Sequence, residues 1–323
     1  MNDLCKDSAT LLEVGEESAG QRIDNFLLRL AKGVPKSHIY RILRSGEVRV
    51  NKGRIGADYK IRVGDVVRVP PIRVAATPVG TVNAPPREFD VVFEDDALIV
   101  LDKPAGVAVH GGSGVSFGVI EQLRRARPQA KLLELAHRLD RETSGLLLVA
   151  KKRSALTKLH DMFRDGAVHK RYLALVKGSW RNTLQHVRLP LTKYLTAEGE
   201  RRVSVTADGK EAHSIVRLVA RWRNFSLVEV ELKTGRTHQI RVHLAHLGFP
   251  LAGDDKYGDF SLNRDLQKVG LKRMFLHAAK LTLPHPLSAE PLAFALPLPQ
   301  DLRGFVARLD ASEKREWGNV EEI

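Results

Sequence analysis

The sequence predicts an α+β protein with a small N-terminal domain and a larger domain whose mixed, mainly antiparallel sheet is flanked by helices. The 323 residues, of which 43% are hydrophobic, are enough for one large core and one small core. In the second part of the chain, short apolar runs outnumber helical patterns, and several follow one another without a helix between them. That order disfavours a doubly wound parallel sheet, in which helices alternate with strands.

Two short amphipathic helices are expected at the start of the small domain. Residues 22–30 place apolar side chains at the i, i+3, i+4, i+7 spacing of a helix. A second helix is expected after Pro35, with Ser37 able to cap its start and Gly46 placed to end it.

Two strands follow these helices and complete a compact α+β module over residues 20–70. The first covers residues 48–50 and leads into the turn sequence Asn51-Lys52-Gly53. The second covers residues 63–69, where apolar and polar side chains alternate up to Pro70.

Basic side chains gather on this module. On the second helix, His38, Arg41 and Arg44 recur every three residues and therefore share roughly one face, away from the apolar residues. A solvated face is the ordinary explanation for such a pattern on a single helix. The basic run continues on both sides of these three residues, at Lys36, Arg49, Lys52 and Arg54. We interpret the whole cluster as a phosphate-binding surface.

The overall charge indicates the same kind of partner. The formal net charge is +14, and cations that neutralise phosphates release condensed counterions, so a polyanion is the favoured ligand. The single cysteine, Cys5, excludes a disulfide within the chain and a cysteine-based metal site. The acidic N-terminus is unlike a signal peptide, and no run approaches the roughly 20 apolar residues of a membrane helix. We therefore expect a cytoplasmic protein.

A proline-rich stretch over residues 71–87 lacks periodicity and divides the chain. We expect a mobile leader over 1–19, the small domain over 20–80, a linker over 81–87, the large domain over 88–310 and a tail over 311–323. Within the large domain we expect strands at 91–93, 98–101, 145–150, 171–176 and 227–232, and helices at 116–125, 154–165 and 237–247.

The segment His137–Gly145 is the first of three that carry chemically useful side chains. It holds Asp140 between Arg138 and Arg141, and its polar run leads into an apolar strand. A charged loop that feeds a buried strand is a common position for a catalytic group. An aspartate that hydrogen-bonds its own loop backbone is an equally good explanation from these residues alone.

The second segment covers residues 233–243. Gly235 marks a turn, Thr237 can cap the helix that follows, and Arg241 falls on the first helical turn. Three histidines occur here and just beyond, at His238, His243 and His246. Their spacing is not the HExxH of a zinc site, so we interpret them as neutral polar or RNA-facing residues.

The third segment, Lys170–Val176, is a hydrophobic strand with Tyr172 near its start, behind two cations. An ordinary core or edge tyrosine is the commoner explanation. The functional alternative is an aromatic platform on which a nucleobase stacks.

Together these segments and the N-terminal module resemble the RluA family of pseudouridine synthases. The likeness is carried by the blocks RIDNFLLRL, VPKSHIYRILRSGEVRVNKGRI, VHGGSGVSFGVIEQLR, HRLDRETSGLLLVAKKRSAL, YLALV, TGRTHQIRVH and DDKYGD, from residue 20 to about 285. Residues 22–69 resemble an S4-type RNA-binding domain. The third block points to those members that modify large-subunit ribosomal RNA. Residues 181–215 and those after 300 match poorly.

The resemblance implies the pseudouridine synthase fold and the isomerisation of uridine to pseudouridine in 23S ribosomal RNA. The reaction adds no atoms and involves no redox change, so we expect neither a cofactor nor a metal. The resemblance makes Asp140 the catalytic carboxylate and pairs it with Arg241. It also implies that Arg138 fills the gap left by a flipped uridine, and that Tyr172 stacks on the uracil and assists loss of its C5 proton. We count Arg236 among the RNA-binding residues, and we expect a monomer that does not contact a membrane.

Two rival functions use the same residues differently. A non-enzymatic RNA-binding factor would use the basic module but not Asp140. A hydrolase of N-glycosidic bonds would release the base, and glycosidases usually employ two cooperating carboxylates. Here Asp140 and Glu142 are two residues apart, so an extended chain points them to opposite faces, and we interpret Glu142 as structural.

Overall fold

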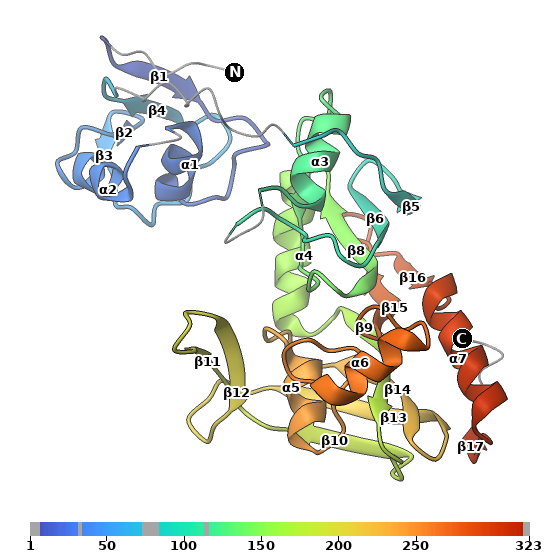
Figure 1. The fold of residues 1–323 in the computed structure, drawn as a ribbon. Helices are drawn as coiled ribbons and strands as arrows, with labels where there is room; N and C mark the ends of the chain where they lie inside the picture. The colour runs from blue at the N-terminus through green and yellow to red at the C-terminus, as the bar shows by residue number, and fades with distance from the viewer. Residues whose placement is uncertain (1–6, 32–33, 73–83, 113–115, 319–323) are drawn as a thin grey trace.

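The computed structural model describes residues 7–31, 34–72, 84–112 and 116–318 (Figure 1). The small domain contains β1 (Thr10–Glu13), α1 (Ile23–Leu30), α2 (Lys36–Arg44), β2 (Arg49–Val50), β3 (Gly53–Arg54) and β4 (Val66–Val69). Its four strands form an antiparallel sheet in the order β1-β4-β2-β3. The apolar faces of both helices and alternate strand residues share one core, which accounts for the predicted α+β module.

Three local features of the small domain test the sequence prediction. Strand β1 pairs with β4, so residues 10–13 belong to the sheet, and the prediction of a mobile leader is wrong for them. Helix α2 begins directly after Pro35, so Ser37 lies inside the first turn and does not cap it. The predicted turn is confirmed, because Asn51 and Lys52 adopt positive φ values of 49° and 68° and fold β2 back onto β3.

The large domain is built on an eleven-stranded sheet. Its strands are β5 (Asp90–Glu94), β6 (Leu98–Lys103), β7 (Glu134–Leu135), β8 (Ser144–Ala150), β9 (His169–Lys177), β10 (Leu184–Arg188), β13 (His213–Arg221), β14 (Phe225–Leu232), β15 (Leu276–Pro284), β16 (Pro291–Ala295) and β17 (Trp317–Gly318). The main path runs β10-β13-β14-β9-β15-β8-β6-β5, and β7, β16 and β17 pair with β8, β15 and β13. Among the described pairs, β15 with β8 is parallel and the others are antiparallel, which confirms the predicted fold class.

Helices cover both faces of this sheet (Figure 1). Helices α3 (Val119–Ala126) and α5 (Gln239–His246) pack on one face, and α4 (Arg153–Asp165), α6 (Phe260–Lys268) and α7 (Gln300–Ser312) pack on the other. The central strand β9 serves both cores because its side chains alternate. Tyr172, Ala174 and Val176 enter the core with α3 and α5, whereas Leu173 and Leu175 enter the opposite core.

Several elements have no counterpart in the prediction, among them one hairpin and the C-terminal helix. Strands β11 (Leu191–Leu195) and β12 (Arg201–Val205) form a separate two-stranded hairpin. Each has five residues, of which one is buried, so the sequence signal of a strand is weak. At the C-terminus, α7 extends to Ser312 and β17 pairs with β13, so the predicted tail over 311–323 contains structured residues. The expected linker over 81–87 and leader over 1–19 lie partly outside the described residues. Within the described ranges, no helix has both the length and the apolar character needed to cross a membrane.

Candidate active site

The loop that carries Asp140 lies between β7 and the start of β8, and neighbouring groups fix its backbone. The Nε2 atom of His137 accepts a hydrogen bond from the backbone N–H of Leu148 at 3.0 Å. Burial lowers the pKa of His137 to about 3, so the ring is neutral and this nitrogen remains an acceptor. The side chain of Leu139 is buried in the core, and the N–H of Thr143 donates to the carbonyl of Asp140 at 3.1 Å.

Lys103 and Gly145 hold the end of the same loop. Lys103 is fully buried, and its Nζ donates to three backbone carbonyls, including that of Arg141 at 3.1 Å. Burial lowers the pKa of this amine to about 7. Gly145 has a φ of +107°, and a Cβ at this position would lie 2.4 Å from the carbonyl oxygen of Ala278. Only glycine therefore lets β8 begin so close to β15.

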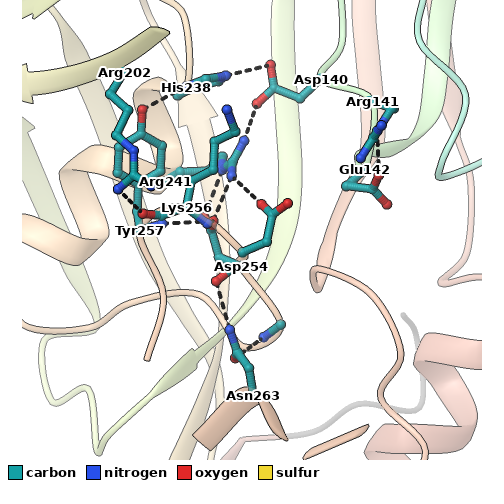
Figure 2. Close-up of polar contacts among 12 residues, drawn as sticks. Asp140, Arg141, Glu142, Arg202, His238, Arg241, Asp254, Lys256, Tyr257 and Asn263 are labelled. Carbon is teal, nitrogen blue, oxygen red and sulfur yellow. Dashed lines mark hydrogen bonds and ion pairs between the residues drawn. The ribbon is translucent and has the colours of Figure 1, made fainter. Parts of the chain in front are cut away.

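The carboxylate of Asp140 points toward Arg241 of α5, and Arg241 is held in turn by Asp254 (Figure 2). The Nη1 atom of Arg241 lies 3.3 Å from Oδ2 of Asp140. Its Nε and Nη2 atoms donate to the two carboxylate oxygens of Asp254 at 2.7 and 2.6 Å. The side chain of Arg241 is 5% exposed and that of Asp254 is 0% exposed, so this two-pronged contact is desolvated. Asp254 therefore fixes the orientation of the Arg241 guanidinium that contacts Asp140.

The backbone around Asp254 completes this arrangement. Oδ1 of Asp254 also accepts the N–H groups of Lys256 and Tyr257, at 2.8 and 3.0 Å. The amide of Asn263 donates to the carbonyl of Asp254 at 2.7 Å. Burial opposes ionisation of this carboxyl, but the hydrogen bond and charge of Arg241 outweigh it and lower the pKa of Asp254. Burial likewise opposes the charge of Arg241, while Asp254 and Asp140 raise the pKa of the guanidinium above its ordinary value.

Asp140 borders a cavity of about 390 Å³, here called the Asp140 pocket. Tyr172 lines it from β9, and Arg138, Arg236, His238 and Arg241 line it as well. Burial and the charge of Asp140 raise the pKa of the Tyr172 hydroxyl, so the phenol is neutral. A second cavity of about 860 Å³ shares Asp140 and Arg138 and extends to the β11–β12 hairpin.

The predicted site residues of the large domain therefore converge. Asp140, Tyr172, Arg241 and Arg138 line one pocket although they come from three separate segments, and Asp140 and Arg241 are 101 positions apart along the chain. Arg236 is exposed at the same pocket, and its Nε donates to the carbonyl of Glu211 at 2.9 Å. Glu142 does not join them, because its carboxylate accepts from Nε of Arg141 at 2.8 Å (Figure 2).

The predicted capping role of Thr237 is wrong. Helix α5 begins at Gln239, and His238 precedes it with a left-handed φ of 53°. The side chain of Gln239 stabilises the turn before the helix, since its Oε1 accepts from Thr234 Oγ1 at 2.7 Å and from the N–H of Arg236 at 3.0 Å. With this left-handed backbone conformation, the ring of His238 points toward Asp140 (Figure 2).

The three histidines of this segment have separate environments. His243 is fully buried, with Nδ1 3.0 Å from Ser214 Oγ and Nε2 2.9 Å from the carbonyl of Leu189, so it faces the core and no RNA. His246 is exposed. In the part of the chain that the structure describes, no three His, Cys, Asp or Glu residues are grouped as metal ligands.

Several residues in or around the pocket were missed by sequence reasoning. Asp254 and Tyr257 lie in the DDKYGD block, which carried the family likeness but gave no sign of a contact with Arg241. Asn263 and Lys103 act through backbone carbonyls, and no residue pattern reveals such contacts. His238 was noted only as one of three histidines.

The predicted RNA-binding cations of the small domain form a surface that we name the N-terminal basic surface. It comprises Lys36, His38, Arg41, Arg44, Arg49, Lys52 and Arg54, all exposed or half-buried. A cavity of about 320 Å³ on the same domain is lined by Tyr40, Arg44 and Arg54. The hydroxyl of Tyr40 donates to Asp24 at 2.9 Å, which fixes the ring beside these two arginines.

Comparison with known proteins agrees with this architecture. Residues 97–246 match the family described as RNA pseudouridylate synthase, and residues 21–67 match the S4 domain. Two human structures, RNA Pseudouridylate Synthase Domain Containing 4 and Domain Containing 1, align with TM-scores of 0.58 at 25% identity. They cover 71% and 76% of this chain and 95% and 93% of their own. The chain is therefore an RNA pseudouridine synthase with an S4 domain.

Sequence relatives narrow the class further. The chain is 48% identical to a Haemophilus influenzae protein over 96% of this chain and 98% of that one. It is 52% identical to a Yersinia pestis protein, over 91% and 93%, and 49% identical to an Escherichia coli protein, over 94% and 97%. All three carry the name ribosomal large subunit pseudouridine synthase C, and the chain belongs to their family.

Proposed function

We propose that this enzyme converts specific uridines of 23S ribosomal RNA to pseudouridine, with Asp140 as the catalytic carboxylate. The relatives are named for the large ribosomal subunit, which supports this substrate. The observation that carries the catalytic assignment is the geometry of Asp140, whose carboxylate borders a pocket and is paired with an arginine that is itself fixed by Asp254. We place the reaction in the cytoplasm, where bacterial ribosomes are assembled.

The reaction breaks the N1–C1′ bond of a uridine and forms a C5–C1′ bond to the same uracil. A proton leaves C5 and N1 gains one, so the product is an isomer of the substrate. Asp140 serves either as a nucleophile at C1′ or as a base that takes a ribose proton to give a glycal. Both routes use the carboxylate as an anion, and the Nη1 atom of Arg241 lies 3.3 Å from its Oδ2 atom and orients it.

The uridine has to leave the RNA stack before its C1′ can approach Asp140. Arg138 is exposed and borders both cavities around Asp140, so its planar guanidinium can take the place of the extruded base. The buried ring of Tyr172 then stacks on the uracil. Because the raised pKa keeps its phenol protonated, we assign Tyr172 to stacking and not to abstraction of the C5 proton.

The small domain provides affinity for structured RNA in this proposal. The cations of the N-terminal basic surface contact phosphates, and Arg236 contacts RNA at the rim of the Asp140 pocket. We propose residues 20–80 and 88–310 as the two functional units, acting as a monomer without a cofactor. The sheet pairing of β1 extends the first unit to residue 10.

Unmodified 23S ribosomal RNA treated with the purified protein tests this function. We expect pseudouridine at a small number of positions in carbodiimide mapping, with no free uracil in the product mixture. Free uracil would instead show a hydrolase of N-glycosidic bonds. RNA binding without either product would show a binding factor, and both results would contradict the proposal.

A further inference from the structure

A chain of three groups ends at the oxygen of Asp140 that Arg241 does not contact. The backbone N–H of Val203, on β12, lies 2.9 Å from the hydroxyl oxygen of Tyr257. That hydroxyl lies 2.8 Å from Nδ1 of His238. Nε2 of His238 faces Oδ1 of Asp140 at 3.9 Å (Figure 2).

The directions of these hydrogen bonds are set by the first of them. A backbone N–H can only donate, so the Tyr257 oxygen accepts from Val203. The hydroxyl has one proton of its own, and the other polar partner that the structure places beside it is Nδ1 of His238. The hydroxyl therefore donates to Nδ1, which makes this nitrogen an acceptor. A neutral imidazole with an unprotonated Nδ1 carries its proton on Nε2, and here that N–H faces Asp140.

Burial favours the neutral ring of His238, whereas the charged groups around it act in both senses. Burial lowers its pKa, Arg241 and Lys256 lower it further, and Asp140 and Asp254 act in the opposite sense without reversing it. Tyr257 meets the ring edge-on at 5.5 Å between centroids. Each ring nitrogen thus has one neighbour, Tyr257 at Nδ1 and Asp140 at Nε2.

We propose that Tyr257 fixes the Nε2–H tautomer of His238, and that His238 thereby positions the catalytic carboxylate by donating to Oδ1 of Asp140 when RNA is bound. Arg241 holds Oδ2, so the two donors together orient both oxygens. The distance of 3.9 Å is longer than a hydrogen bond. Contacts of this kind commonly tighten only in the substrate complex. The inference rests on the proposed function of Asp140.

The relay also connects the active site to the β11–β12 hairpin. Tyr257 receives its orienting hydrogen bond from β12, and Arg202 of the same strand donates to the carbonyl of Lys256 at 3.0 Å. The hairpin pairs with no other strand of the described chain, so these contacts help to dock it. Displacement of the hairpin would break the hydrogen bond to the Tyr257 hydroxyl, and His238 would then no longer be held in one tautomer.

The tautomer itself can be measured without any catalytic activity. In full-length protein with ¹⁵N-labelled histidines, we expect His238 to show a protonated Nε2 and an unprotonated Nδ1 at neutral pH, with assignment by loss of the signal in His238→Gln. Tyr257→Phe should give a mixture of the two tautomers. Tyr194→Phe changes an exposed tyrosine of the hairpin and should leave the Nε2–H tautomer unchanged. A protonated Nδ1 or a charged ring in the wild type would overturn the inference, whatever the outcome for pseudouridine formation.

Single-turnover kinetics on 23S ribosomal RNA tests the positioning role. We expect His238→Gln to lower the rate roughly tenfold and His238→Phe roughly 100-fold, with RNA affinity unchanged, since a lost donor to a reacting group has effects of this size. His246→Gln, on the exposed part of α5, is the matched control. Tyr257→Phe alone should lower the rate, but the double variant with His238→Gln should be no slower than His238→Gln alone. Independent, multiplying effects would show that Tyr257 does not act through His238.

The pH profile gives a readout that a merely structural role would not change. The active form of His238 is the neutral ring, and the pKa of this ring is lowered. The wild-type rate should therefore fall only at a pH below 6.5, the ordinary pKa of histidine. Tyr257→Phe removes the hydrogen bond that stabilises the neutral ring, so its acid limb should move to higher pH. This displacement should vanish when His238→Gln is also present, and an identical displacement in that background would contradict the relay.

Discussion

The Asp140 pocket and the N-terminal basic surface use charge in opposite ways. At the pocket, Arg241 is 5% exposed and its partner Asp254 is 0% exposed, so these two charges hold each other in a fixed position. On the small domain, Arg41 pairs with Glu47 at 3.8 Å, and solvent screens the attraction because the two side chains are 61% and 43% exposed. The first arrangement fixes one geometry, whereas the second makes weak, exposed contacts that a polyanion can replace.

This difference predicts different consequences of mutation. Removing one partner of a desolvated pair leaves a buried charge without compensation, which affects both geometry and folding. Removing an exposed cation takes away one phosphate contact and little else. The two regions should therefore separate in experiment, with rate and stability changing at the pocket and with affinity and salt dependence changing at the basic surface.

The largest effect among the supporting residues is expected for Asp254→Asn. It leaves the guanidinium of Arg241 without its two-pronged partner, so we expect a loss of about 3–5 kcal/mol in the free energy of unfolding. The rate of pseudouridine formation should fall by about 100-fold or more, because Arg241 no longer faces Asp140 in one orientation. Denaturant unfolding and single-turnover assays measure the two effects.

Asp255→Asn is the matched control for this change. Asp255 lies 3.3 Å from the same Nη2 atom of Arg241 but is 62% exposed. We expect nearly unchanged stability and rate. Equal losses in the two variants would contradict the distinction between fixed and solvated charge.

Arg138→Ala should have the next largest effect. Stacking of a planar group on a base contributes about 1–3 kcal/mol, so we expect the rate to fall roughly 10- to 100-fold while ground-state RNA binding changes little. A 2-aminopurine placed beside the target uridine should report slower flipping. Arg141→Ala removes an adjacent exposed cation and should leave both readouts near the wild type. Equal losses of affinity and rate would argue against base replacement.

The smallest effect on rate is expected for the triple substitution of Arg41, Arg44 and Arg54 by alanine. The log–log slope of affinity against salt should become shallower by about 3, or about 1 for each lost phosphate contact. Single-turnover rate at saturating protein should be nearly unchanged. An exposed triplet of the large domain, Arg303, Arg308 and Lys314, provides the charge-matched control. An unchanged slope in the first variant would refute the role of the basic surface.

Sequence reasoning was most effective where side chains repeat with a period or belong to a contiguous block. The continuous apolar run of β9 follows from burial on both faces, and the helical stripe of α1 follows from burial on one face, so both elements were predicted. The loop with Asp140 and the segment with Arg241 were also found, because each is a dense polar run next to an apolar one. Their mutual distance of 3.3 Å depends on the fold and has no local signal.

The contacts that fix the pocket could not be predicted from local sequence patterns. Asp254, Asn263 and Lys103 act on guanidinium or backbone atoms that the chain brings close only after folding. The left-handed conformation of His238 is unusual for a residue with a side chain, and propensity favours Thr237 as the cap instead. The β11–β12 hairpin escaped notice because each of its strands has five residues, of which one is buried.

The most direct test of the central claim is tritium release from RNA labelled at C5 of uridine, measured in single turnover with Asp140→Asn. We predict that this variant binds the RNA with wild-type affinity and releases tritium at least about 1,000-fold more slowly. Glu142→Gln, which changes the neighbouring carboxylate that pairs with Arg141, should retain most of the wild-type rate. Turnover by Asp140→Asn at a rate near the wild type would contradict the assignment of Asp140 as the catalytic carboxylate.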